Sequence, residues 1–149
     1  MTGKECYKGL GKRPRLDAAT VEYGLLPAFM ADHGLLPQWR YGVFEARDFF
    51  GGVPEDREIC NSAGGCIHEN KCIYVSVRAI KTCSPAQIKD VILHEIAHAL
   101  VPRSKDHGYA WQIKAAEIGV RKREIIRYAL VESVRPVHRD RLYRVAFGG

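Results

Sequence analysis

The stretch Val91-Ile92-Leu93-His94-Glu95-Ile96-Ala97-His98-Ala99-Leu100 is apolar apart from two histidines and one glutamate. On a helix, a spacing of four residues places the imidazoles of His94 and His98 on one face, where they can share a metal ion. Glu95 lies one residue further round, outside direct coordination but within reach of a metal-bound water as a general base. The alternative is a pair of buried, hydrogen-bonded histidines. We favour a zinc site, because polar groups in an apolar turn need partners and a metal supplies them.

A third protein ligand is expected, because catalytic zinc usually has three and keeps its fourth position for water. His107 is the first candidate, since it follows a proline-containing loop and precedes Gly108, whose backbone freedom suits a turn into the next helix. Glu117, further along that helix, is the alternative. We favour His107 and expect one zinc ion per chain, held by His94, His98 and His107.

The helix that carries the motif has clear limits in the sequence. Ser84 suits the N-cap and Pro85 the first helical position, and Gln87 can return a hydrogen bond to the cap as in a capping box. Pro102 is expected to stop the helix, since proline cannot continue it. The sequence therefore predicts a helix from Pro85 to just before Pro102.

Upstream of this helix, Asp17 is a suitable N-cap for a helix that ends near Gly34, with Pro27 expected to kink or restart it. Aromatic and β-branched residues then indicate strands. The expected strands are residues 39–50, 58–60 and 72–77. Together these elements predict an α+β fold, in which a small, mostly antiparallel sheet packs on the N-terminal helix and the motif helix.

Downstream of the motif, a second helix is expected from about His107 to Gly119, which supplies a C-terminal cap. Residues 124–131 have helical spacing, whereas residues 142–147 favour a strand. The chain is thus expected to form one domain.

The predicted domain organisation has a flexible basic arm at residues 1–15 and a single domain at residues 16–149. Within that domain we expect a core at residues 17–119 and a basic extension at residues 120–149.

The composition and charge narrow the class of protein. The chain has 149 residues, 46% of them hydrophobic and 27% charged, which excludes a wholly disordered protein. The formal net charge is +6, with basic residues gathered at residues 4–15 and 121–144. Such segments are usually solvated, and contact with nucleic acid is the alternative. No apolar run approaches the roughly 18 residues of a membrane helix, so no membrane partner is expected.

The five cysteines bear on location and on a second metal site. An odd number of cysteines without an N-terminal signal sequence indicates a reducing compartment, and we expect a cytoplasmic protein. Cys60, Cys66 and Cys72 recur around His68, so a structural metal site has to be weighed. Structural zinc ligands usually come in pairs about two to four residues apart. We therefore favour small apolar roles for these cysteines.

Four segments occur in a characteristic order along the chain, and the last two are the most specific. They are Leu35-Leu36-Pro37 before the aromatic strand, Ile73-Tyr74-Val75-Ser76, His94-Glu95-Ile96-Ala97-His98-Ala99-Leu100, and His107-Gly108-Tyr109-Ala110-Trp111. In this order they resemble the SprT-like zinc metalloprotease family over about residues 17–119. The resemblance implies a minimal zincin-like domain with His94, His98 and His107 as zinc ligands and Glu95 as the general base.

The resemblance also implies an activity and partners. It predicts that zinc and Glu95 hydrolyse peptide bonds of protein or peptide substrates, including nucleic-acid-associated proteins. Many family members continue into a Cys-x-x-Cys zinc ribbon that can contact DNA, whereas this chain has a basic stretch in that position. The alternative function is a catalytically inactive, metal-stabilised nucleic-acid-binding module, which would use the basic segments against phosphate.

Two further features have open roles. The strand at residues 72–77 either binds an extended substrate through its backbone or simply packs against the motif helix. Tyr109 is either a donor to the oxyanion of the reaction or part of the core, and we favour the core.

Overall fold

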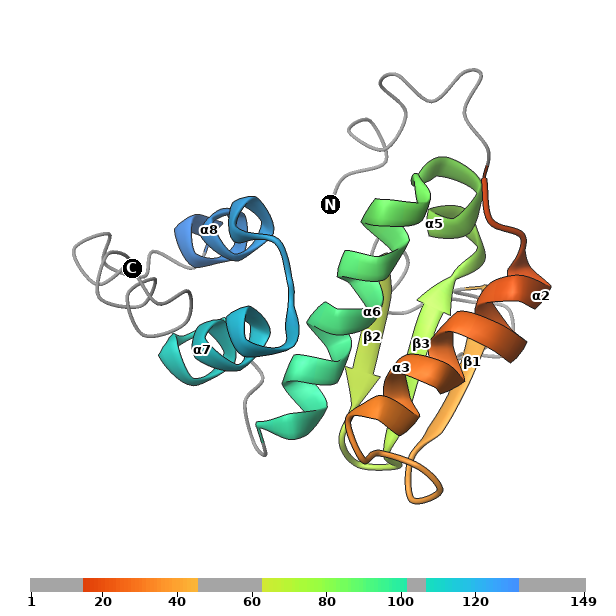
Figure 1. Cartoon of the computed structure of the whole chain (residues 1–149), viewed down its shortest axis with the longest axis horizontal. Helices are drawn as coiled ribbons and strands as arrows, with labels where there is room; N and C mark the ends of the chain where they lie inside the picture. The colour runs from red at the N-terminus through yellow and green to blue at the C-terminus, as the bar shows by residue number, and fades with distance from the viewer. Residues whose placement is uncertain (1–14, 46–62, 102–106, 132–149) are drawn as a thin grey trace.

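The computed structural model describes residues 15–45, 63–101 and 107–131. In chain order, the elements are α2 (Ala18–Thr20), the π-helical turn η1 (Val21–Leu25), α3 (Leu26–Asp32), β1 (Arg40–Phe44), β2 (Gly64–Ile67), β3 (Cys72–Ser76), α5 (Val77–Thr82), α6 (Pro85–Leu100), α7 (Tyr109–Ile118) and α8 (Lys122–Val131). This is an α+β fold, as predicted (Figure 1). The predicted strands at 58–60 and 142–147 and nearly all of the predicted arm at 1–15 lie outside the described residues.

The sheet has three strands in the order β1-β3-β2, with β1 parallel and β2 antiparallel to the central strand β3. The prediction of a mostly antiparallel sheet is therefore wrong for one of the two pairings. A short turn at residues 68–71 joins β2 to β3 and forces them to run in opposite directions. The long connection from β1 to β3 imposes no such constraint, so these two strands can be parallel.

The hydrophobic core lies between one face of the sheet and the helices α3 and α6, which run across that face (Figure 1). Ile73 and Val75 contribute from β3, and Ile88, Ile92 and Ile96 form a stripe along α6 at intervals of four residues. All five side chains are fully buried. α7 and α8 lie on the other side of α6 from α3, so the motif helix is enclosed from two directions (Figure 1).

Pro27 disturbs the N-terminal helix without ending it. Asp17 caps the helix as predicted, and the chain remains helical through α2, η1 and α3. In the π-helical turn, the Leu26 N–H donates to the Val21 carbonyl oxygen five residues earlier. Pro27 has no N–H, and its ring would clash with the carbonyl four residues before it in a regular α-helix. The wider π turn accommodates the proline where a kink or restart was expected.

The helix α5 is absent from the sequence-based prediction, which ended the strand at Val77. Instead, β3 ends at Ser76, whose hydroxyl accepts a hydrogen bond from the Ala79 N–H at 3.0 Å. A serine N-cap therefore starts this short helix, just as another serine starts the helix that follows it.

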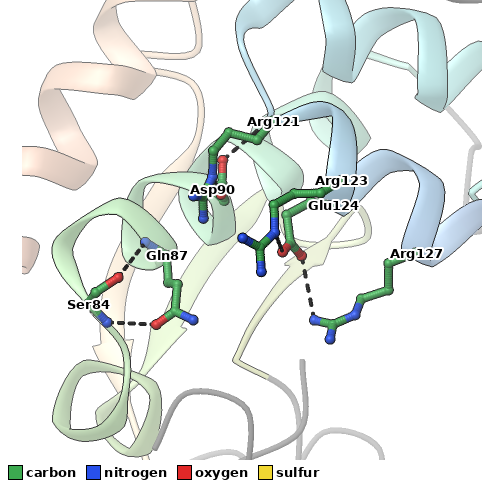
Figure 2. A network of polar contacts seen from close by, with 7 residues as sticks. All are labelled: Ser84, Gln87, Asp90, Arg121, Arg123, Glu124 and Arg127. Carbon is green, nitrogen blue, oxygen red and sulfur yellow. Dashed lines mark hydrogen bonds and ion pairs between the residues drawn. The ribbon is translucent and has the colours of Figure 1, made fainter. Parts of the chain in front are cut away.

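The limits of α6 agree with the prediction. The Gln87 N–H donates to the Ser84 hydroxyl at 3.2 Å, and the Ser84 N–H donates to Oε1 of Gln87 at 2.8 Å (Figure 2). This is the predicted capping box. At the other end, Val101 is extended, with φ −110° and ψ 90°. The following proline disfavours helical geometry at this residue, so α6 ends here.

α7 and α8 complete the described chain and add to the hydrophobic core. α7 ends at Gly119, which adopts the left-handed conformation with φ 103° as predicted for a C-cap. α8 covers the helical spacing predicted for residues 124–131. Val120 and Ile125 belong to the hydrophobic core, which therefore continues beyond Gly119. No helix in the described ranges is long and apolar enough to cross a membrane.

Candidate metal centre

Three histidines converge near the C-terminal half of α6. His94 and His98 belong to this helix, and His107 lies just before α7. Nε2 of His107 lies 2.9 Å from Nε2 of His94 and 3.2 Å from Nε2 of His98. Zinc–nitrogen bonds of about 2.0–2.1 Å in tetrahedral geometry place neighbouring nitrogens about 3.3 Å apart. The three nitrogens therefore converge with nearly the spacing that one shared ion requires. Across residues 15–45, 63–101 and 107–131, this is the only group of three or more side chains arranged to hold a metal ion.

Glu95 lies beside these nitrogens and is buried. Its Oε1 is 3.6 Å from Nε2 of His94, and its Oε2 has no hydrogen-bond partner within the described part of the chain. Burial raises the pKa of Glu95 to about 8. An unsatisfied buried oxygen costs about 1–3 kcal/mol, and a nearby cation with its water would both satisfy the oxygen and favour the ionised carboxylate. The surroundings of Glu95 thus fit a metal ion at the histidines.

The electrostatics of His94 also suit a metal ligand. Burial, reinforced by the neighbouring His98 and His107, lowers the pKa of His94 well below its ordinary value. The imidazole is therefore neutral at physiological pH, and a neutral imidazole has a nitrogen lone pair available for a metal ion.

Trp111 and Gln112, on α7, hold the backbone of the histidine cluster. Trp111 is fully buried, and its indole N–H donates to the His94 carbonyl oxygen at 3.1 Å. The Gln112 side chain, 1% exposed, donates to the His107 carbonyl oxygen at 2.7 Å. Sequence reasoning assigned no role to either residue. The signal for Gln112 was a lone uncharged polar residue on a largely apolar helix, one position after the tryptophan.

Tyr128, on α8, also contacts the cluster. Its ring centroid lies 4.4 Å from that of His94 and 4.7 Å from that of His107. The side chain is half-buried, in contrast to the fully buried Trp111. Sequence reasoning missed Tyr128, because a tyrosine within a helical segment carries no local sign of what it will meet.

An ionic contact joins the start of α8 to α6. The buried carboxylate of Asp90 accepts hydrogen bonds from the backbone N–H of Arg121 at 3.3 Å and from its Nε at 2.5 Å (Figure 2). Next to it, buried Glu124 pairs with Arg127 and Arg123 at 3.7 and 3.8 Å. Asp90 lies one helical turn before the first histidine of the motif, so this contact places α8 alongside the cluster.

The structure leaves Glu117 out of the histidine cluster and shows Tyr109 as an exposed residue. Glu117, the alternative third ligand, has a side chain that is 48% exposed and pairs with Nζ of Lys114 at 2.9 Å. It does not join the group of candidate metal ligands. Tyr109 is 39% exposed, so the expectation that it packs in the core is wrong. It is the first residue of α7.

The described cysteines do not form a second group of metal ligands. Cys60 lies outside the described residues, and Cys66 and Cys72 point to opposite faces of the sheet, because Cys72 stands opposite Ile67, the neighbour of Cys66. Burial raises the pKa of both thiols, which keeps them protonated and poorly nucleophilic.

The position of β3 decides between its two predicted roles. β3 is the central strand and is paired on both sides, so no edge is left for an extended substrate. The prediction of backbone addition to this strand is therefore wrong. Its alternative, packing against the motif helix, is confirmed by the contacts between α6 and β3.

The fold and the cluster define a class of protein: an α+β domain with a candidate metal centre built from a His-Glu-x-x-His helix and a later histidine. The family model of the SprT-like family matches residues 51–129, slightly more than half of the chain. The chain belongs to the SprT-like family. The match reaches into α8 and includes Tyr128. Among curated proteins and solved structures, none matches the chain significantly.

Proposed function

We propose that this protein is a zinc-dependent metallopeptidase that hydrolyses peptide bonds. The observation that carries the proposal is the convergence of three histidine nitrogens beside a buried glutamate with an unsatisfied oxygen. Membership of the SprT-like family supports it, because that family is generally of the metallopeptidase type. A cytoplasmic location remains a prediction.

The proposed roles follow from the chemistry of each side chain. His94, His98 and His107 would hold the ion through Nε2. When bound, zinc would polarise the scissile carbonyl and lower the pKa of a water molecule. Glu95 takes the proton from the attacking water and then passes it to the leaving amine. Its burial keeps bulk water away from this proton transfer.

Protein or peptide substrates are proposed to pair with β2, in place of the predicted pairing with β3. β2 is an edge strand of the described sheet, and α6 packs against it. A Cβ added to Gly64 would lie 3.5 Å from Cγ of Glu95, so the backbone of β2 passes beside the general base. An extended substrate that pairs with the outer edge of β2 would also pass beside Glu95. It would bind through hydrogen bonds between its backbone and that of β2.

Metal analysis of the purified protein tests the site. Protein prepared without added zinc is expected to contain about one zinc per chain. His107→Ala should lose the zinc, because two histidines alone hold it weakly. Glu117→Ala is the matched control, because Glu117 also follows the motif in the sequence and was the alternative third ligand. This variant should retain the zinc. Wild-type protein that is folded but contains no zinc, and binds none when zinc is added, would contradict the proposal.

Cleavage of an unfolded protein substrate tests the activity. Glu95→Gln should reduce the rate at least about 100-fold, because general acid–base catalysis contributes that much or more. The variant should keep its zinc, since Glu95 is not proposed as a ligand. If Glu95→Gln cleaved at the wild-type rate, the general-base role would be wrong. If wild type bound DNA in a salt-sensitive manner and never cleaved protein, the nucleic-acid-binding alternative would replace the peptidase.

A further inference from the structure

Two aromatic rings from different helices flank the histidine cluster, and they are held differently. Trp111 donates a hydrogen bond to the backbone of His94 and belongs to the hydrophobic core, and its ring centroid lies 4.6 Å from that of His94 and 4.7 Å from that of His107. Tyr128 meets the imidazoles through its ring, at an interplanar angle of 61° to His94 and 33° to His107. The tyrosine thus touches two of the three candidate ligands without being part of the motif that supplies them.

The place of the tyrosine is set by the rest of α8. Ile125 and Ala129, on either side of Tyr128 in the sequence, are each 1% exposed and fix one face of the helix against the protein. Upstream, the contact between Asp90 and Arg121 holds the start of the helix on α6 (Figure 2). The ring is therefore presented to the histidines by an anchored helix, and it meets them in a defined position.

We propose that Tyr128 is a positioning residue of the metal centre, whose ring keeps the imidazoles of His94 and His107 in the orientation that binds zinc. An imidazole can rotate about its side-chain bonds, and each rotation moves Nε2 away from the common point. A ring packed against two of the three imidazoles removes these rotations before the metal arrives. Groups that orient metal ligands typically contribute about 10–100-fold in metal affinity.

The inference rests on the proposed function only where the histidines bind zinc, and it does not depend on peptide hydrolysis. It assigns the effect to the flat ring, because the ring makes the contacts with the two imidazoles. Phenylalanine at this position should therefore replace tyrosine. The inference also implies that α8 is part of the metal centre, although the whole of α7 lies between His107, the last candidate ligand, and α8.

The test is the zinc affinity of the full chain, measured by competition with a chromophoric chelator. Tyr128→Ala should weaken zinc binding about tenfold or more. Tyr128→Phe should bind zinc nearly as wild type does. Ile126→Ala is the matched control, because Ile126 is half-buried on the same helix and lies outside the hydrophobic core cluster. Its zinc affinity should be unchanged.

Thermal unfolding of the metal-free variants separates positioning from general stability. Zinc binding by Tyr128→Ala should remain weaker at temperatures where the metal-free variant is fully folded. If Tyr128→Ala does not fold, Tyr128→Leu retains apolar bulk without the flat ring and should show the same loss. Wild-type affinity in the folded alanine or leucine variant, or an equal loss in Tyr128→Phe, would overturn the inference.

The outcomes also distinguish this inference from the proposed function. Wild-type protein that binds zinc, with Tyr128 variants that bind it equally well, would overturn the positioning role and leave the peptidase proposal standing. Zinc binding that depends on Tyr128 in a protein that cleaves no substrate would support the positioning role and remove the peptidase. Wild-type protein that binds no zinc would overturn both.

Discussion

The α7 side and the α8 side of the histidine cluster each place an aromatic ring against the imidazoles, but they differ in burial and in hydrogen bonding. On the α7 side, Trp111 and Gln112 are almost completely buried and donate hydrogen bonds to the carbonyl oxygens of His94 and His107. On the α8 side, a half-buried Tyr128 contacts the imidazole rings, and its helix is anchored to α6 by an ion pair one turn before His94.

This difference indicates which contacts contribute mainly to the free energy of unfolding and which contribute mainly to metal affinity. Hydrogen bonds from buried donors to the backbone of the candidate ligands are part of the core, so losing them destabilises the fold and the site together. A ring contact at the edge of the core can be removed with a smaller loss of stability. Because the Trp111 ring also contacts the imidazoles, we expect α7 variants to change both the free energy of unfolding and metal binding, and α8 variants to change metal binding first.

The largest effect is expected for Trp111→Ala. Removing a fully buried indole should lower the free energy of unfolding of the metal-free protein by about 3–5 kcal/mol. Urea denaturation followed by circular dichroism measures this loss. Trp111→Phe should recover much of it, and the remaining deficit reports the lost bond to the His94 carbonyl, about 1 kcal/mol, plus the smaller ring.

The matched control for this tryptophan is the other one in the chain. Trp39 is half-buried, and its ring meets that of His68 edge-on at 5.8 Å between centroids. Trp39→Ala should therefore cost less than Trp111→Ala and leave zinc affinity unchanged. If both variants lost the same free energy of unfolding, Trp111 would contribute no more to the stability of the core than Trp39 does.

A smaller effect is expected for Arg121→Ala, which releases the start of α8. Asp90 is 4% exposed and, among the residues that the structure describes, would keep only the backbone N–H of residue 121 as a partner, so the free energy of unfolding should fall by about 1–3 kcal/mol. Zinc affinity should fall as well, because α8 presents Tyr128. Thermal denaturation and chelator competition on the same samples measure both.

Arg123→Ala is the control for this ion pair. The Arg123 side chain is 72% exposed and lies 3.8 Å from Glu124, a geometry that contributes little in water. Its removal should change stability by less than about 1 kcal/mol and should not affect zinc affinity. A loss of stability in Arg121→Ala with unchanged zinc affinity would show that the anchor of α8 and the metal centre are independent.

The motif helix and the place of Glu95 on it could be predicted from the sequence because their signals are local. The spacing of His94, Glu95 and His98 places them on a helix without knowledge of any other element. The ends of α6 were equally accessible, since Ser84 and Gln87 bond to each other and Pro102 restricts the residue before it. His107 was accessible too, through its place at a turn into the next helix.

The remaining features depend on residues that meet only after folding. Asp90 and Arg121 are 31 positions apart, and nothing near either residue in the sequence identifies its partner. The direction of β1 depends on a long connection in the same way, so the parallel pairing was missed. At Val77 a local signal failed, because the aromatic and β-branched residues at 73–77 outweighed the serine cap that starts α5.

The smallest effect is expected at the far end of the motif helix, for Ser84→Ala. This change removes the hydroxyl that accepts the Gln87 N–H, and the loss of an N-cap costs about 1 kcal/mol. The metal site lies more than two turns further along α6, and the intervening residues Ile88 and Ile92 stay buried in the core. Thermal unfolding should therefore show a lower midpoint while chelator competition shows unchanged zinc affinity. A parallel loss of zinc affinity would mean that the N-terminus of α6 and the histidines near its other end are energetically coupled. The stability of the fold and the zinc affinity could then not be changed separately.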